Sequence, residues 1–129
     1  MASPEAWIRA TIEAESSVDA YPMVVPEGTV PPFIIYSRSS TTRERAMDGT
    51  LGGPAGQFDV EIYSDSYSAG KDLAALVLDA LIDFEGTANG VTIFSSDISD
   101  ESDGQPVFLD GRDVPTYVIS QSYLIQWQE

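Results

Sequence analysis

One segment of the chain, residues 66–85, has the apolar spacing of a long helix, and this limits the available folds most strongly. Apolar side chains recur there at steps of three and four positions, at Leu73, Leu76, Val77, Ala80, Leu81 and Phe84. Ser66 or Ser68 can cap the start of this helix, and Gly86 supplies a stop. A single long helix has to cover a sheet, because no second long helix is available to pack against it.

Four further segments have the composition of β-strands: residues 32–43, 57–64, 90–98 and 116–128. The second alternates most clearly, with apolar positions at Phe58, Val60 and Ile62 and polar-face positions at Asp59, Glu61 and Tyr63. This pattern predicts a half-buried strand with one wet face. The last strand carries one apolar face, interrupted by Gln121, at Tyr117, Ile119, Tyr123, Ile125 and Trp127.

The remaining segments read as one short helix and three connections. Ser3-Pro4 caps an N-terminal helix that ends near Glu15, with Trp7, Ile8 and Ile12 on its apolar side. Residues 16–32 contain four prolines and read as an extended connection. Residues 44–56 read as a flexible glycine-rich link, and residues 99–115 as a long acidic connection.

The resulting element order is α-β-β-α-β-β. It predicts an α+β fold, a two-layer sandwich in which one long helix and the short N-terminal helix accompany a mostly antiparallel four-stranded sheet. Neither half of the chain can bury a core alone, so residues 1–129 are expected to form a single domain.

Composition excludes most catalytic chemistry. The chain has neither histidine nor cysteine, which excludes Ser-His-Asp triads, imidazole zinc sites and thiolate sites. We therefore expect no enzyme, cofactor or metal, and a small hydrolase that uses carboxylates is the least favoured class. With 21 acidic residues against six basic ones, the net charge of −15 also disfavours a surface that grips nucleic acid.

Two further features favour a location away from membranes. No apolar run approaches the roughly 20 residues that span a bilayer. The N-terminus has neither a basic leader nor an apolar core, so we expect no secretory signal and no membrane partner.

An acidic stretch contains Asp97, Asp100, Glu101 and Asp103. It departs from a calcium-binding loop, because Ser99 stands at the first ligand position and Asp110 at the last, where calcium loops carry Asp and Glu. A solvated acidic turn is the simpler interpretation.

Half of the basic residues are gathered in one place: Arg38, Arg43 and Arg45 lie within eight positions and are three of the six cations. Their charges can be solvated, or paired with Glu44 and Asp48 nearby. Alternatively, they dock on the acidic face of a neighbouring copy, which a polyanionic protein needs for self-association. The sequence leaves both interpretations open.

An apolar island, Val107, Phe108 and Leu109, lies between turn signals at Asp103-Gly104 and Asp110-Gly111. It is a second candidate contact surface. The alternative is a small local hairpin packed on the sheet edge.

Several of these pieces resemble one viral family. They are "YPMVVPEGTVPPFIIY", the basic loop, "FDVEIYSDSYSAGKDLAALVLDAL" and the acidic stretch before the last strand. Together they resemble the tail-completion or tail-terminator proteins of long-tailed double-stranded DNA bacteriophages. The Tyr21-Pro22 element, the strand from Pro32 to Tyr36 and the join at residues 59–69 carry the likeness.

The resemblance implies a ring, typically of six subunits, at the head-proximal end of the tail tube. It implies that the ring ends tube growth and docks to the head connector, with the tail tube protein and the connector or neck protein as partners. DNA then passes through an acidic lumen without specific binding, for which Asp97, Asp100, Glu101 and Asp103 are candidates. The expected location is the virion, after assembly in the host bacterial cytoplasm. A head-completion or connector adaptor protein, or a free acidic binding module, is the alternative.

Overall fold

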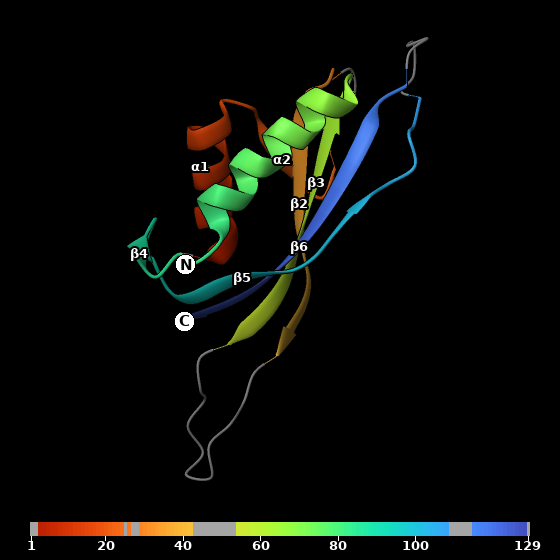
Figure 1. The fold of residues 1–129 in the computed structure, drawn as a ribbon. Helices are drawn as coiled ribbons and strands as arrows, with labels where there is room; N and C mark the ends of the chain where they lie inside the picture. The colour runs from red at the N-terminus through yellow and green to blue at the C-terminus, as the bar shows by residue number, and fades with distance from the viewer. Residues whose placement is uncertain (1–2, 25, 27–28, 43–53, 109–114, 129) are drawn as a thin grey trace, which may run out of the picture.

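Two helices lie on one face of a six-stranded sheet in the computed structural model of the chain (Figure 1). The structure describes residues 3–24, 26, 29–42, 54–108 and 115–128. The helices are α1 (Pro4–Ser16) and α2 (Tyr67–Leu81). The strands are β1 (Ala20–Pro22), β2 (Phe33–Thr42), β3 (Ala55–Ser64), β4 (Gly86–Ala88), β5 (Val91–Asp103) and β6 (Tyr117–Gln128). The predicted α+β class is confirmed. The predicted link at residues 44–56 lies mostly outside the described residues, and its last two residues belong to β3.

The order of strands across the sheet is β1-β2-β3-β6-β5-β4. The four predicted strands form the antiparallel centre, but the sheet has six strands and is mixed, so the four-stranded prediction is wrong. The proline-rich connection contributes β1, which pairs in parallel with residues 34–36 of β2. Proline is tolerated in an edge strand of this kind because its missing N–H is not needed by a further neighbour.

The other additional strand, β4, results from a tight hairpin. Asn89 and Gly90 both have positive φ, 54° and 78°, and connect β4 to the start of β5. An Asn-Gly pair favours this two-residue turn because both residues enter the left-handed region at low cost. The hairpin begins at Gly86, the residue that the sequence assigned to the stop of the long helix.

Helix α2 begins as predicted and ends earlier. The Ser66 side chain accepts a hydrogen bond from the Ala69 backbone N–H at 3.4 Å, which confirms Ser66 as the N-cap. The helix ends at Leu81, not at residue 85, because the chain turns back toward the sheet. Asp83 has a φ of 58°, and its N–H donates to the Ser96 carbonyl of β5 at 2.7 Å. Phe84 then packs on Trp7 of α1 with ring centroids 4.9 Å apart.

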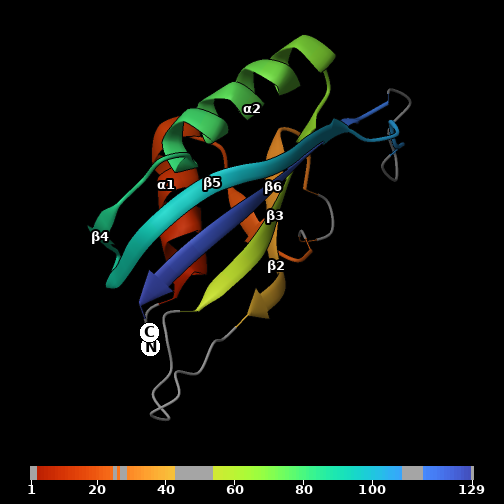
Figure 2. The same ribbon diagram turned by 60° about the horizontal axis from the view of Figure 1, so that its bottom comes forward.

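The core lies between the helices and the sheet. Its buried side chains include most of the predicted apolar positions of α1, β3 and β6: Trp7, Ile8, Ile12, Phe58, Val60, Ile62, Ile119, Tyr123, Ile125 and Trp127. Tyr117, at the start of β6, is only partly buried. Figures 1 and 2 show α1 and α2 on the same side of the sheet, which leaves the opposite face without a helix. One face of the sheet is therefore packed against the helices, and the other is exposed to solvent.

Strand β5 extends through the predicted acidic connection. It pairs with β6 up to the Asp103–Ile119 pair, although the sequence suggested an end near Ile98. Register shifts between Ile93 and Ser95 and between Ile98 and Asp100 interrupt the ladder. Pairing with the apolar strand β6 outweighs the low strand propensity of the acidic residues.

Candidate functional site

The face of the sheet opposite the helices, here called the open face, is the main candidate site (Figure 2). Directly paired residues of antiparallel strands share a face, so the pairing register identifies its members. Asp59 of β3 pairs with Ser37 and Ser122, and Ser122 pairs with Asp100 of β5. The same register adds Gln57, Glu61, Asp97, Ser102 and Ser120. Carboxylates and hydroxyls therefore dominate the centre of this face.

Hydrogen bonds between and within strands order these side chains. The Ser122 hydroxyl donates to Asp59 at 2.8 Å, and the Tyr63 hydroxyl lies 3.4 Å from the Glu61 carboxylate. Burial first, and then the Glu61 charge, raises the pKa of Tyr63 above its ordinary value. A shallow hollow of about 310 Å³ is lined by Asp59, Glu61 and Asp100 together with serine side chains. None of the cations among the described residues belongs to this face.

The structure divides the four predicted lumen acids between the two faces. Asp97 and Asp100 pair with Leu124 and Ser122 on the open face. Glu101 pairs with the buried Gln121, so its side chain and that of Asp103 turn toward α2. The stretch forms a strand, so the prediction of an acidic turn is wrong. Strand alternation separates Asp100 from Glu101, and the register shift between Ile98 and Asp100 keeps Asp97 and Asp100 on the same face.

Asp103 anchors the end of β5 to the first turns of α2. Its carboxylate accepts a hydrogen bond from the Tyr67 hydroxyl at 2.6 Å and forms an ion pair with the Lys71 ammonium at 2.7 Å. The Lys71 ammonium also lies 5.4 Å from the Tyr67 ring centroid. Hydrogen bonds from Lys71 and then Tyr67 lower the pKa of Asp103 below its usual value. The same contacts raise the pKa of Lys71 and of Tyr67.

Gln121, which interrupts the apolar face of β6, is the centre of a buried polar network. Its amide nitrogen donates to the Ala74 carbonyl at 3.0 Å and to Glu101 at 2.7 Å. Its amide oxygen accepts from the Tyr123 hydroxyl at 2.7 Å. Burial raises the pKa of Tyr123 far above the ordinary tyrosine value, so this hydroxyl stays a donor. The network connects α2, β5 and β6 without an unpaired amide atom.

The predicted basic cluster lies only partly within the described residues. Arg38 belongs to β2 and forms an ion pair with Glu5 of α1. Arg43 and Arg45 lie outside the described residues. The other described cations also have partners in the chain, since Arg9 pairs with Glu13 and Lys71 with Asp103.

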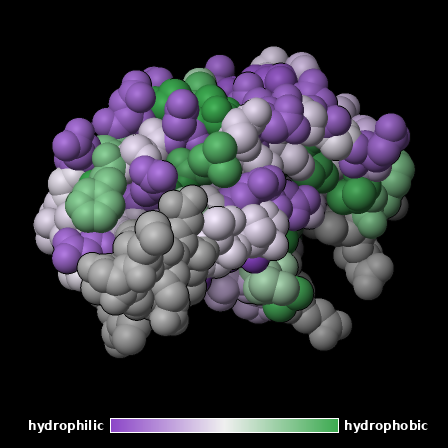
Figure 3. All heavy atoms as spheres, turned by 90° about the horizontal axis from the view of Figure 1, so that it is seen from below, coloured by the Kyte–Doolittle hydropathy of each residue, from purple (hydrophilic) through white to green (hydrophobic). Residues whose placement is uncertain are grey.

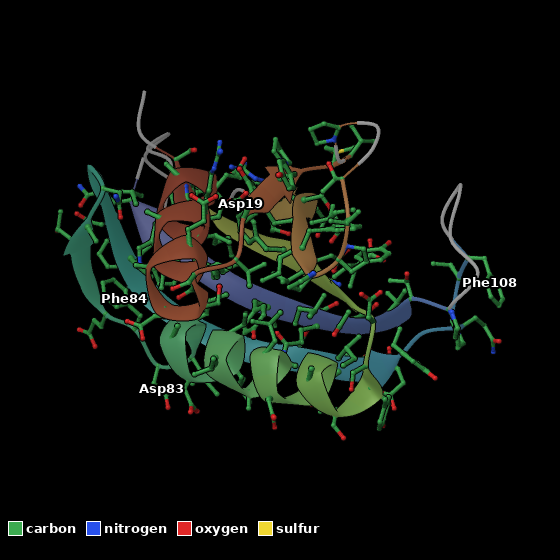
Figure 4. All side chains as sticks on the ribbon, turned by 90° about the horizontal axis from the view of Figure 1, so that it is seen from above. Asp19, Asp83, Phe84 and Phe108 are labelled. Atoms are coloured by element: carbon green, nitrogen blue, oxygen red, sulfur yellow. The ribbon has the colours of Figure 1, made fainter. Side chains whose placement is uncertain are left out.

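The predicted apolar island lies at the end of the β5–β6 arm, residues 104–108 and 115–116. The Val107 N–H donates to the Thr116 carbonyl at 2.9 Å, and the Thr116 N–H donates back at 2.6 Å. Phe108 is 67% exposed and projects away from the helices and the sheet (Figure 4). Leu109 lies outside the described residues.

The described part of the chain holds no group of three or more His, Cys, Asp or Glu side chains that could bind a metal ion. Among the same residues, neither helix has the length and apolar character needed to cross a bilayer.

The sequence missed two acids of the open face as site residues. Asp59 and Glu61 were visible as the wet face of a strand, and the signal was their alternation with buried apolar positions. Only the pairing register places them on the same face as Asp97 and Asp100. Strands β3 and β5 both pair with β6, although these acids lie about 40 positions apart in the chain. Seen from below the view of Figure 1, the surface is hydrophilic over much of its area and carries separate apolar patches (Figure 3).

The chain is similar to known proteins both as a family member and in its fold. A family model described as Tail completion protein gp17 matches residues 3–106. A chain from a solved structure described as the virion of a native gene transfer agent (GTA) particle aligns with a TM-score of 0.63 at 17% identity. The alignment covers 93% of this chain and 86% of that chain, and shows a shared fold. A second solved chain aligns at 19% identity over 98% of both chains, with a TM-score of only 0.48. The curated proteins gave no match.

Proposed function

Because the chain belongs to the family of Tail completion protein gp17, we propose that it is a structural protein of a phage virion. It forms a ring, typically of six subunits, at the head-proximal end of the tail tube. The ring ends tube polymerisation and joins the tail to the head connector. Its partners are copies of itself, the tail tube protein and the connector protein, and it performs no catalysis. The fold shared with a chain from a virion particle supports a virion location, after assembly in the host bacterial cytoplasm.

The open face is the observation that carries the proposed role in DNA passage. It combines four carboxylates, Asp59, Glu61, Asp97 and Asp100, with hydroxyl side chains and with no cation from the described residues. A surface of this kind repels phosphates over a Debye length of roughly 8 Å. We assign the open face to the lumen of the ring, where DNA has to move without being held.

This assignment refines the predicted set of lumen acids. Asp97 and Asp100 remain in it and gain Asp59 and Glu61 as neighbours across the sheet. Glu101 and Asp103 instead contact Gln121, Tyr67 and Lys71 of their own chain. We therefore propose that Glu101 and Asp103 hold β5 against α2 and so stabilise the arrangement of strands that forms the open face.

The subunit contacts need attraction between polyanionic copies. Arg38 has its partner Glu5 within the chain, so we assign the contact with a neighbouring subunit or the tube chiefly to Arg43 and Arg45. In a ring, one surface of each copy meets a different surface of the next, and closure limits the assembly. Val107 and Phe108, exposed at the end of the β5–β6 arm, are the second proposed contact.

We also propose that residues 1–129 form one folding unit. The sheet order interleaves strands from both halves of the chain, since β3 is bonded to β6 and β6 to β5. The core likewise contains side chains of both α1 and β6. Removal of either half leaves an unpaired sheet edge and an uncovered core.

Sedimentation velocity of the full chain, alone and with the tail tube protein, tests the proposed function. We expect a monomer in equilibrium with a closed ring, or a ring once the tube is present. A filter-binding assay in the same buffer is expected to show no retention of duplex DNA at physiological salt. A strictly monomeric chain that binds a basic host protein instead favours the free acidic module. A ring that binds the connector but not the tube favours a head-completion adaptor.

A further inference from the structure

An apolar groove of about 450 Å³ lies between α2 and the segments that flank β1. Val18, Pro32, Leu73 and Leu76 contribute its apolar lining. Leu76 was predicted to face the core but is 47% exposed, because the apolar stripe of α2 is wider than the surface that the sheet and α1 cover. The groove therefore leaves a large aliphatic side chain without the burial that its position in the helix suggests.

A complementary feature lies at the end of the β5–β6 arm. The Gly104 N–H donates to the Val118 carbonyl at 2.8 Å, and the paired bonds between Val107 and Thr116 hold the arm further out. This backbone pairing holds Phe108 on an ordered support. Little conformational entropy is therefore lost when its phenyl side chain is buried. Figure 4 shows Phe108 well away from α1 and α2, and therefore away from the groove of its own copy.

We propose that Phe108 of one copy inserts into the α2 groove of the next copy, beside Leu76. This inference rests on the ring proposed above and names one of its contacts. The aromatic side chain and the groove lie on different elements of one subunit, so each copy offers one of each. An aromatic side chain that fits a pocket elsewhere on an identical molecule makes a head-to-tail contact, and such contacts form a ring when the rotation closes.

A second copy is the occupant that fits the charge of the chain. Each copy has a net charge of −15, so contacts through charged surfaces repel unless a cation intervenes. Val18, Leu76, Val107 and Phe108 are uncharged. The groove lining also includes Asp65 and Asp72, and an uncharged aromatic side chain buries against the apolar part of the lining without adding a charge there. An aromatic side chain also buries the largest apolar area for one residue, about 150–250 Å².

Cross-linking tests this contact directly, because the sequence contains no cysteine and each introduced thiol is therefore unique. The double variant Leu76→Cys with Phe108→Cys is isolated as rings, or within complete tails if rings form only on the tube, and treated with a short bis-maleimide. We expect a ladder of covalent oligomers up to the full ring on a denaturing gel. A mixture of the two single variants is expected to stop at the dimer.

The matched control is Leu76→Cys with Phe94→Cys, since Phe94, in β5 itself, is also an exposed aromatic residue, 48% exposed. We expect no ladder from this pair. As a second readout, Phe108→Ala is expected to weaken ring assembly about 10- to 100-fold, and Phe94→Ala to leave it within about twofold.

The outcomes separate this inference from the proposed function. If rings form normally but give no ladder between positions 76 and 108, the docking contact is wrong and the proposed ring still stands. Cross-links from Phe108→Cys to another tail protein alone also overturn the docking contact. A chain absent from tails and unable to form rings contradicts the proposed function first, and the docking contact with it.

Discussion

The guanidinium carbon of Arg38 lies 4.8 Å from the centroid of the Trp127 ring, on the side of the sheet that faces the helices. The same carbon lies 5.2 Å from the Phe58 ring centroid, and the Arg38 guanidinium also pairs with Glu5 of α1. One residue of the predicted basic cluster therefore connects the N-terminal helix to three strands. Planar stacking and a forked hydrogen-bond geometry explain why arginine suits this position better than lysine.

Arg38→Ala is expected to lower the free energy of unfolding by about 1–3 kcal/mol, because it removes the cation–π contacts and leaves Glu5 without its partner. Arg38→Lys should recover only part of this loss. Urea denaturation followed by tryptophan fluorescence measures both. The control is Arg9→Ala, whose exposed pair with Glu13 should contribute less than about 1 kcal/mol. Equal effects of Arg38→Ala and Arg9→Ala contradict this role for Arg38.

Gln121→Ala is expected to lower the free energy of unfolding by about 2–4 kcal/mol, since it leaves the Tyr123 hydroxyl unpaired in the core and removes the side-chain hydrogen bonds to the Ala74 carbonyl and to Glu101. Calorimetry or urea denaturation measures the change. Ser122→Ala is the matched control, because Ser122 is the next residue of β6 but lies on the open face. A stability loss from Ser122→Ala as large as that from Gln121→Ala is the result that argues against a special role for the buried network.

Acid should release the end of β5 from α2. The pKa of Asp103 is lowered in the folded chain, so its contribution to stability is present above the unfolded value and is lost as pH falls through the folded value. We expect the Lys71 and Tyr67 resonances to change together in an NMR titration below about pH 4. In Asp103→Asn this joint change should vanish, whereas in Asp100→Asn, on the open face, it should persist. A joint change in Asp103→Asn rules out this assignment.

Charge reversal on the open face should turn the conduit into a DNA-binding surface. The double variant Asp97→Lys with Asp100→Lys is expected to fold and assemble, to retain duplex DNA at physiological salt, and to reduce DNA delivery by the particles. Filter binding and particle infectivity measure these effects. The control, Asp79→Lys with Glu85→Lys, makes the same charge change at exposed positions in and after α2. Similar DNA retention by both variants means that net charge, not the open face, governs the effect.

Reversal of the two remaining arginines of the cluster should block assembly. Arg43→Glu with Arg45→Glu is expected to leave circular dichroism and thermal unfolding of the monomer unchanged, since the described core contains neither residue. The loss of attraction to an acidic neighbour should shift sedimentation from ring to monomer. Arg9→Glu, a charge reversal on α1, serves as the control. Normal rings from the double variant contradict the proposed contact.

The alternating pattern made the centre of the sheet predictable. Phe58, Val60 and Ile62 are buried and Asp59 and Glu61 reach the open face, as the period of two requires. The short edge strands were not predictable in the same way, because three residues carry no periodicity. For β4 the Asn89-Gly90 pair was a usable signal of a hairpin, and it was overlooked.

The candidate site depends on pairing between distant residues, which one sequence does not reveal. The acidic residues 99–103 have low strand propensity, yet pairing with β6 makes them a strand and sends alternate side chains to opposite faces. Gln121 stood out as a polar break in an apolar face, but its partners Ala74 and Glu101 are 47 and 20 positions away. These contacts separate Glu101 and Asp103, which hold β5 against α2, from Asp97 and Asp100, which lie on the open face.

The most direct test of the account is an electron cryo-microscopy reconstruction of the head-proximal end of the tail at a resolution that separates strands. We predict a closed ring of this subunit with α1 and α2 on the outside and with Asp59 and Asp100 directed toward the central channel. A ring whose helices line the channel, or a tail end without this subunit, contradicts the account.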